Sequence, residues 1–585
     1  MLLESGDVRK LQVNKLSQNS RSRNAAFAIV AAFLSGACSA GHDAGVIGVG
    51  DNGERPNFLL IVVDDMGFSD LGSFGGEIET PNLDQLALAG VRLTNFVAGS
   101  TCSPTRSMLL TGVDNHRAGL GNMLEELAPN QKGRPGYEGQ LNTRVVTIAS
   151  LLGKAGYRTM MTGKWHLGQG DDSGPSARGF DHSFTMLQGG ASHFSDMRPA
   201  YAPTPEIKAK YRENGIALDA LPDEFEYSSQ FYVDRLITYL SETAASDAPF
   251  FAYLSFTAPH WPLQAPAQTV EKYHGRYDAG YDELLVSRLA RAKELGVIPE
   301  TATVNPAPPK HRPWHSLDEE DKRRASRAME IYAAMIDEVD RHSGRLFDYL
   351  RASGEFDNTV IIFLSDNGAE GHDLDETWPA DLFPEIRKTI DESHDFSFEA
   401  MGHPGSYVLY GPDWGRAGSP AFNLYKAFPT DGGTRVAAFV HYPAFEKTGV
   451  INTVISVKDI TPTVLELAGV KRPDGDFNGR TVEKISGLSQ VNLLSGKATG
   501  RDDKNRVLVF ELFGKRSVRR GDWKLVHMPE PYGTNDWQLF DLASDSGEAN
   551  DVAAKNPEVV NELIAQWQKY VDENNVILPD WVSGY

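Results

Sequence analysis

The fold is decided by the stretch Asn57-Phe58-Leu59-Leu60-Ile61-Val62-Val63, which is followed directly by Asp64-Asp65. A run that is almost wholly apolar, without the alternation of a half-exposed strand, predicts a β-strand buried on both faces. Strands of this kind form parallel sheets whose two faces are covered by helices. In such sheets ligands bind beyond the carboxyl ends of the strands, so Asp64 and Asp65 are candidate site residues.

Two more buried strands are predicted to deliver polar residues in the same way. Residues 359–365 form an apolar run that ends in Asp366-Asn367-Gly368, and residues 250–256 form another that leads to His260. Both runs have the length and composition of strands in the interior of a sheet.

Helical patterns separate these strands. They cover residues 81–89, after the capping residue type Thr80; residues 143–154, closed by Gly156; and residues 318–351, ended by Gly354. Strands that alternate with helices predict the α/β class, with a large, mostly parallel sheet covered by helices on both faces.

We predict a main domain over residues 56–505 and a smaller C-terminal subdomain over residues 506–585. Within the main domain, residues 371–412 are rich in Gly, Pro, Asp and His and have no clear period, so we expect an insertion folded over the site. The subdomain is predicted to be an antiparallel sheet with one helix. Its strands are expected at 507–510, 523–526 and 537–540, and its helix at about 557–571.

Residues 1–40 are predicted to be a signal peptide that exports the protein to the periplasm or the cell surface. Basic residues precede an apolar run from Ala25 to Leu34, which suits a signal peptide but is too short to cross a bilayer. The string Leu34-Ser35-Gly36-Ala37-Cys38 resembles a bacterial lipoprotein processing site, except that Ser35 stands where an aliphatic residue is usual. Lipid attachment at Cys38 and ordinary cleavage after Ala37 or Ala40 both stay open. Residues 41–55 are expected to be a linker.

The composition is that of a soluble globular protein with a strong negative charge. Apolar residues make up 41% of the chain, and 79 acidic residues outnumber 57 basic ones, for a net charge of −22. Because nucleic acids and anionic lipids carry the same sign, we expect no nucleic-acid partner and no membrane contact apart from a lipid anchor at Cys38. An anionic substrate would have to meet cations placed locally in the site.

Cys102 lies in the segment Ser100-Thr101-Cys102-Ser103-Pro104-Thr105-Arg106, which continues to Gly112. A lone cysteine is usually an inert buried residue. This segment, however, resembles the signature of the type I sulfatases, in which the cysteine of a Cys-x-Pro-x-Arg sequence is oxidised to formylglycine. Residues 156–166 resemble the second signature of that family, although Thr162 stands where a smaller or aliphatic residue is commoner. The resemblance runs from about Arg55 into the C-terminal region, and residues 406–412 and 424–426 are most similar to bacterial arylsulfatases.

This resemblance implies an alkaline-phosphatase-like fold and assigns a role to each matching position. The implied metal ligands are Asp64, Asp65, Asp366 and Asn367. The implied catalytic residues are Cys102 as the formylglycine precursor and Arg106 for the hydrate and the metal-side charge. Lys164 and His166 are implied beside the formylglycine, with His166 as the base for sulfate elimination. His260 is implied near the leaving-group oxygen, and Lys426 is implied to bind sulfate or to help protonate the leaving group. A formylglycine-generating enzyme is the implied maturation partner.

The demands of sulfate transfer agree with these assignments. An aldehyde hydrate carries two hydroxyls on one carbon, so one can attack sulfur and the other can later expel sulfate as the aldehyde re-forms. A divalent cation with nearby guanidinium and ammonium groups would stabilise the sulfuryl group in transit. Ligands that offer only oxygen favour calcium or magnesium over zinc, and we expect calcium, with magnesium as the alternative.

We therefore expect an arylsulfatase, an enzyme that cleaves a small sulfate monoester to an alcohol or phenol plus sulfate. Taken singly, each site residue has a structural explanation, such as turn formation by Asp366-Asn367-Gly368. The joint occurrence of all of them in family order favours catalysis.

Two other functions are weighed against this one. The first is a formylglycine-dependent phosphonate or phosphodiester hydrolase, a branch that tends to carry an imidazole at the position of Asn367. The second is a non-catalytic surface protein that binds sulfated glycans, for which a convertible Cys102 would serve no purpose.

Overall fold

A computed structural model describes residues 55–497 and 505–581 of the chain. The predicted signal peptide 1–40, the lipidation candidate Cys38 and all of the predicted linker 41–55 except Arg55 lie outside the described residues. Within the described part of the chain, no helix is both long and apolar enough to cross a membrane.

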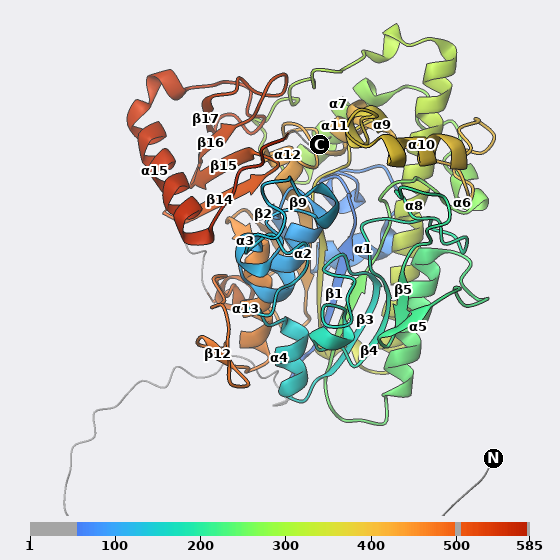
Figure 1. Ribbon diagram of the computed structural model, residues 1–585, viewed down its shortest axis with the longest axis vertical. Coiled ribbons are helices and arrows are strands. Elements are labelled where there is room, and N and C mark those ends of the chain that lie inside the picture. The colour runs from blue at the N-terminus through green and yellow to red at the C-terminus, as the bar shows by residue number, and fades with distance from the viewer. Residues whose placement is uncertain (1–54, 498–504, 582–585) are drawn as a thin grey trace, which may run out of the picture. The chain divides into compact units, whose positions relative to one another are not determined.

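The large sheet has eleven strands and is mixed, with mostly parallel strands at its centre (Figure 1). The strands in spatial order are β10 (Gly449–Ile451), β2 (Val91–Val97), β9 (Arg435–His441), β8 (Thr359–Ser365), β1 (Asn57–Val63), β7 (Phe250–Ser255), β3 (Arg158–Lys164), β4 (His182–Met186), β5 (Tyr211–Glu213) and β6 (Ile216–Leu218), with β11 (Ile455–Ser456) beside β2. Parallel pairs join β1 to β7 and β8, β3 to β4 and β7, and β2 to β10 and β11. Strand β9 runs antiparallel to β2 and β8. The α/β prediction and the three predicted buried strands are confirmed.

Strand β1 is buried on both faces because its side chains alternate between two hydrophobic cores. Leu59, Ile61 and Val63 belong to one core, and Phe58, Leu60 and Val62 belong to the other. This explains why residues 58–63 of the strand are all apolar, since neither face reaches solvent.

Helices cover each of these two faces. On the first side lie α1 (Pro81–Ala89), α5 (Ser228–Glu242) and α8 (Glu319–Ala352); on the second lie α2 (Cys102–Thr111), α4 (Ile148–Lys154) and α13 (Ile460–Leu467). Figure 1 shows α5 and α8 on one side of the sheet and α2, α4 and α13 on the other. Asp318 caps α8 by accepting a hydrogen bond from the backbone N–H of Asp321.

Two details of the helix predictions are wrong. The helix predicted from residue 143 begins only at Ile148, because the side chain of Thr147 accepts the N–H of Ser150 and so forms the cap there. Thr80 precedes α1 but makes no cap to its backbone, since its hydroxyl donates to Asp84 at 2.9 Å instead.

The stretch 371–412 holds more regular structure than its composition suggests. It contains α9 (Leu374–Thr377) and α10 (Pro384–Ser393), and α11 (Gly411–Gly418) begins at its end. A capping box of Asp373 and Glu376 opens α9, and Pro384 opens α10. These are local signals that a search for hydrophobic periodicity does not detect.

The C-terminal residues form a four-stranded antiparallel sheet that packs against one helix, as predicted. Strand β15 was missing from the prediction because Lys515-Arg516-Ser517-Val518-Arg519-Arg520 is mostly charged; only Val518 joins the core under α15. The elements are β14 (Val507–Leu512), β15 (Lys515–Arg520), β16 (Trp523–His527), β17 (Trp537–Asp541) and α15 (Pro557–Asn574).

Candidate active site

The centre of the site lies at the carboxyl ends of β1 and β8. These strands are parallel neighbours, so Asp64-Asp65 and Asp366-Asn367 leave the sheet side by side. The backbone N–H of Asp65 donates to Asp366 Oδ1 at 3.3 Å, and Asn367 Nδ2 donates to Asp65 Oδ1 at 2.7 Å. Asp65 has a left-handed backbone with a φ of 72°, a conformation that costs energy for a residue other than glycine. The chain thus accepts local strain to bring four oxygen-bearing side chains together.

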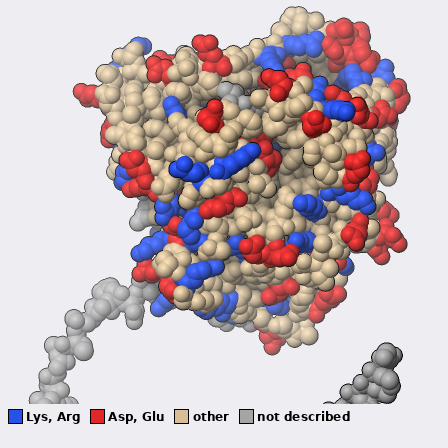
Figure 2. All heavy atoms as spheres, in the orientation of Figure 1, with Lys and Arg blue, Asp and Glu red and all other residues tan. Residues whose placement is uncertain are grey.

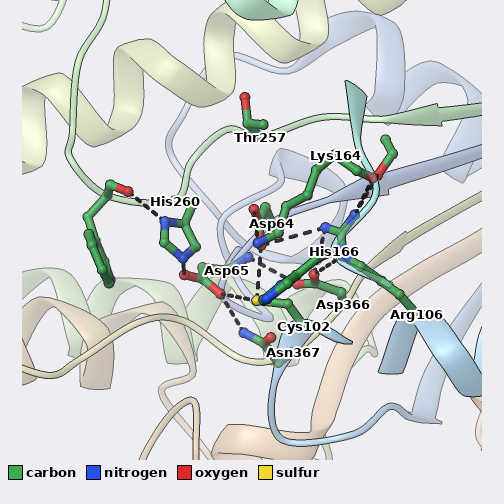
Figure 3. Close-up of polar contacts among 12 residues, drawn as sticks. Asp64, Asp65, Cys102, Arg106, Lys164, His166, Thr257, His260, Asp366 and Asn367 are labelled. Atoms are coloured by element: carbon green, nitrogen blue, oxygen red, sulfur yellow. Dashed lines mark hydrogen bonds and ion pairs between the residues drawn. The ribbon is translucent and has the colours of Figure 1, made fainter. Parts of the chain in front are cut away.

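Cys102 is the first residue of α2 and faces these carboxylates (Figure 3). Its Sγ lies 3.3 Å from Asp64 Oδ1 and 3.8 Å from Asp65 Oδ1, and its side chain is buried. Burial raises the pKa of the Cys102 thiol well above its ordinary value, and Asp366 adds to that rise. The unmodified thiol is therefore held in its protonated form.

Arg106 lies one helical turn after Cys102 and ties three strands to the site. Its Nε and Nη2 contact Asp366 Oδ2 at 2.8 and 2.7 Å. Its Nη1 donates to Ser255 Oγ at 2.5 Å and to the carbonyl of Lys164 at 3.1 Å. Burial raises the pKa of Asp366, but Arg106, Lys164 and Lys426 together lower it further than burial raises it, so that carboxyl stays ionised.

Two buried ammonium groups neutralise the pair of aspartates after β1. Lys164, the last residue of β3, places Nζ 2.6 Å from Asp64 Oδ2, and Lys426 places Nζ 2.9 Å from Asp65 Oδ2. Lys426 also contacts Glu370 Oε2 at 3.0 Å. Even with Lys164 beside it, burial raises the pKa of Asp64 to about 7. The site therefore holds more carboxylate than its lysines balance.

Two histidines complete the predicted set. His260 Nε2 lies 3.6 Å from Asp65 Oδ2, while its Nδ1 meets the carbonyl of Trp261 at 2.5 Å. His166 Nε2 contacts Glu125 Oε1 at 3.0 Å, and its Nδ1 is buried with no hydrogen-bond partner among the described residues. Burial lowers the pKa of both imidazoles, so each is neutral and able to accept a proton.

The oxygen atoms of the site fit a hard divalent cation. Asn367 Oδ1 is buried and makes no hydrogen bond within the described structure, although the same side chain donates through Nδ2. Ligand atoms of Asp64, Asp65, Cys102 and His260 all lie within 4.8 Å of one another. An unpaired amide oxygen beside three carboxylates is the donor set that calcium and magnesium prefer.

The positive charge in the site comes from buried side chains. Arg106, Lys164 and Lys426 are each at most 2% exposed. On the face of the molecule in Figure 2, by contrast, acidic and basic side chains are interspersed. Inside the site, a substrate anion would meet these three cations at close range.

All ten predicted site residues converge at one place, but sequence reasoning missed their supporting neighbours. Glu125 holds His166 and accepts the hydroxyl of Tyr201 at 2.8 Å, and Glu370 holds Lys426. Glu370 follows Asp366 by four residues, so its place near the motif was a usable signal. Glu125 lies in η2 (Leu124–Glu126), and no motif marks it.

Comparison with known proteins agrees with this geometry. Residues 56–470, most of the chain, match the protein-family model described as Sulfatase. The chain belongs to the sulfatase family. It is 43% identical to an uncharacterized sulfatase of Schizosaccharomyces pombe, over 90% of this chain and 95% of that protein. It is 37% identical to an arylsulfatase of Klebsiella aerogenes, over 77% of this chain and 94% of that protein. The chain is therefore a sulfatase, an enzyme that hydrolyses sulfate esters.

Solved structures share the sulfatase fold. The structure of Ps i-CgsB in complex with k-i-k-neocarrahexaose superposes with a TM-score of 0.63 at 22% identity, over 90% of this chain and 95% of that one. A phosphonate monoester hydrolase of Agrobacterium radiobacter gives a TM-score of 0.51 at 21% identity, over 89% of this chain and 96% of that one. At these identities the likeness extends to the fold alone.

Proposed function

We propose that this sulfatase is an arylsulfatase that acts through a formylglycine made from Cys102. The observation that carries the proposal is the position of Cys102, whose Sγ lies 3.3 Å from Asp64 in a buried ring of carboxylates and cations. Formylglycine hydrate supplies two hydroxyls on one carbon, one to attack sulfur and one to release sulfate afterwards. A residue placed there reaches both the metal ligands and the cavity.

The surrounding residues have separate tasks in this scheme. His166, whose Nδ1 is unpaired in the described structure, accepts the proton when sulfate is released. His260 and Lys426 both contact Asp65. His260 lies near the leaving-group oxygen, and Lys426 binds a sulfate oxygen or donates a proton to the leaving group. Arg106 and Lys164 hold Asp366 and Asp64 in place and add positive charge.

Asp64, Asp65, Asp366 and Asn367 would hold one divalent cation, calcium in our proposal and magnesium as the alternative. When bound, the cation stabilises negative charge on sulfate and lowers the pKa of the nucleophilic hydroxyl. The unpaired Asn367 oxygen supports this assignment, since a buried amide oxygen without a partner is costly.

An aryl leaving group is favoured by the cavity wall and by the bacterial arylsulfatase relative. Tyr201, Trp261 and Trp378 line the cavity beside Cys102. The phosphonate or phosphodiester alternative is disfavoured because Asn367 occupies the position where an imidazole is expected. A purely glycan-binding role leaves the assembled catalytic groups unexplained.

The decisive experiment concerns Cys102. Protein made in a host with a formylglycine-generating enzyme should hydrolyse 4-nitrophenyl sulfate, and mass spectrometry of the Cys102 peptide should show conversion to the aldehyde. Cys102→Ala should reduce kcat by at least about 10⁴-fold, since the nucleophile is removed. Full activity in that variant would defeat the mechanism.

The phosphorus alternative has its own measurement. We expect kcat/KM for an aryl sulfate to exceed that for the matching aryl phosphate diester or phosphonate monoester. A higher value for the phosphorus substrate would reverse the assignment.

We further propose that the chain is exported and that its signal peptide, which lies within residues 1–40, is cleaved off. The basic and apolar sequence described above supports this proposal. Mass spectrometry of the mature amino terminus should find either lipid-modified Cys38 or a start after Ala37 or Ala40. Retention of Met1 in the cell-envelope fraction would contradict it.

A further inference from the structure

A carboxyl group without a partner lies in the wall of the active-site cavity. Glu126, the last residue of η2, is 0% exposed, and neither of its carboxyl oxygens has a hydrogen-bond partner in the described part of the chain. Glu126 lines the same cavity as Cys102, His166 and Lys426. The steps of sulfate transfer described above make no use of it.

The backbone at Glu126 is well fixed. Its N–H donates to the carbonyl of Met123 at 3.1 Å, and its carbonyl accepts from Asn122 Nδ2 at 2.7 Å. Asn122 is itself held, because it also donates to Gln131 Oε1 at 3.1 Å. The chain therefore fixes this carboxyl in the cavity wall and yet provides nothing to satisfy it.

The Glu126 carboxyl is neutral in this setting. An isolated carboxylate cannot be buried cheaply without a cation, and burial together with the neighbouring Glu125 raises the pKa of Glu126 well above its ordinary value. A neutral carboxyl group offers one O–H donor and an acceptor oxygen. Buried polar groups of this kind are nearly always paired in folded proteins, so the partner of Glu126 is a group that enters the cavity, a water in the resting site or a polar group of a bound ligand.

The rest of the cavity wall suits an uncharged ring. Tyr201 and Trp378 have ring centroids 4.9 Å apart, and Trp261 lies 6.4 Å from Tyr201. Glu125 lines the cavity too, with a side chain that is 18% exposed. Burial would raise the pKa of Glu125, but its contact with His166 keeps that pKa low, so the carboxyl is charged. A leaving group with its own negative charge would be repelled there.

We propose that Met123, Glu126, Tyr201, Trp261 and Trp378 form a leaving-group subsite for an uncharged aryl ring that bears a hydroxyl group. Glu126 donates a hydrogen bond to that hydroxyl and accepts one from it. This inference rests on the proposed aryl sulfate hydrolysis. The aromatic side chains stack on the ring, and Glu125 excludes rings that carry a carboxylate or a second sulfate.

The test compares substrates whose leaving groups have similar intrinsic reactivity. We would measure kcat/KM for phenyl sulfate, 3- and 4-hydroxyphenyl sulfate and 4-carboxyphenyl sulfate, with the mature enzyme and with Glu126→Leu and Glu126→Gln. The wild-type enzyme should prefer the better hydroxyphenyl isomer over phenyl sulfate by about tenfold or more, as expected for one hydrogen bond in a dry site. The carboxyphenyl ester should be the poorest substrate.

The two variants separate recognition from folding. Glu126→Leu should bring the hydroxyphenyl preference close to 1 by a larger loss of kcat/KM on the hydroxyphenyl ester than on phenyl sulfate, and its thermal midpoint should equal or exceed that of the wild type, because an unpaired buried polar group is removed. Glu126→Gln keeps a donor and an acceptor and should keep most of the preference.

Several results would overturn the subsite. An unchanged preference in Glu126→Leu would do so, as would a lower thermal midpoint with equal losses on every substrate. A wild-type preference near 1 for both isomers would refute it as well. Absence of all aryl sulfate activity in the wild type would instead refute the proposed function, so the two failures are distinguishable.

Discussion

Two buried ion clusters in this protein use the same side-chain types but differ in charge balance. At the active site four carboxylates, from Asp64, Asp65, Asp366 and Glu370, face the three permanent cations of Arg106, Lys164 and Lys426. The second cluster joins the large sheet to the C-terminal sheet. There two carboxyl groups, from Asp431 and Glu548, face the three cations of Lys524, Arg519 and Arg435.

This difference in charge balance shows that burial of charged side chains does not by itself identify a catalytic centre. In the second cluster Lys524 Nζ contacts Asp431 Oδ1 at 2.6 Å and Glu548 Oε1 at 3.0 Å, and Arg435 lies 3.5 Å from Asp431 Oδ2. Asp431 Oδ2 and Glu548 Oε1 make no hydrogen bond among the described residues, but each faces a cation, and the cations outnumber the carboxyl groups. At the active site the carboxylates are in excess and Asn367 Oδ1 is unpaired within the described structure. A deficit of positive charge beside the unused amide oxygen fits a site for a divalent cation.

Removal of the divalent cation should therefore have the largest effect, and only at the active site. Dialysis against a chelator should lower kcat/KM by at least about 10³-fold, because a cation contributes several kcal/mol to stabilising the transition state. It should also lower the free energy of unfolding by about 2.7 kcal/mol if the cation was present at 100 times its Kd. Activity assays and thermal unfolding, before and after calcium or magnesium is restored, measure both effects.

The matched control for this experiment is the second cluster. A Glu548→Gln variant should respond to the chelator as the wild type does, since Glu548 belongs to a cluster without a cation deficit. Full activity in a preparation shown by elemental analysis to be metal-free would contradict the charge argument.

Loss of one cation from the second cluster should reduce stability and spare catalysis. Lys524→Met leaves Asp431 and Glu548 buried without their shared partner, which should cost about 3–5 kcal/mol of unfolding free energy. Because Lys524 does not line the cavity, kcat/KM per folded molecule should change by less than about threefold.

Denaturant unfolding and initial rates at a temperature well below the midpoint provide the two readouts. Adding Glu548→Gln to Lys524→Met should recover part of the loss, since one unpaired charge is removed. A large fall in kcat/KM with unchanged stability would mean that the second cluster also serves catalysis.

Sequence reasoning found the active-site cluster but not the second one. The active-site ligands follow long apolar strands, so β1 and β8 could be predicted from composition and their neighbouring ends from the rules of parallel sheets. No comparable sequence pattern places Lys524 beside Asp431. They meet because β16 of the C-terminal sheet packs on the short α12 (Asp431–Thr434), a tertiary contact that no local pattern encodes.

The same limit applies to Glu125 and Glu126. Both lie in a three-residue helix without a hydrophobic period, and their importance depends on which cavity the loop lines. The fold and the motif residues could thus be predicted from the sequence. Glu125 and Glu126 could be identified only from the way the chain packs around the cavity.

A third buried cluster should make stability depend on pH. His116 lies between Asp114 at 3.4 Å and Glu511 at 3.1 Å, with Tyr570 at 3.1 Å. Burial opposes its charge, but the two carboxylates raise the pKa of His116 from 6.5 to about 9. The folded state therefore holds a proton that the unfolded state has released at pH 8.

The resulting stability should be fully present below about pH 6.5 and lost as the pH rises through about 9. The protonated imidazole contributes about 3 kcal/mol on this basis. Denaturant unfolding of the wild type and of His116→Gln at pH 6, 7.5 and 9 would measure it. The difference between the two proteins should shrink with rising pH, and a constant difference would show that the imidazole is neutral in the folded state.

The smallest effect is expected from an ion pair of the same residue types at the surface. Arg520 on β15 contacts Glu562 on α15 through both nitrogen–oxygen pairs, one of them at 2.9 Å, but the side chains are 22% and 52% exposed. Water and salt screen such a pair, and the two long side chains lose conformational freedom when they are fixed. A double-mutant cycle of Arg520→Gln and Glu562→Gln should therefore give a coupling energy of about 0.2–1 kcal/mol, which added salt should reduce further. A coupling near that of Lys524 with Glu548 would mean that the difference between the clusters does not come from burial.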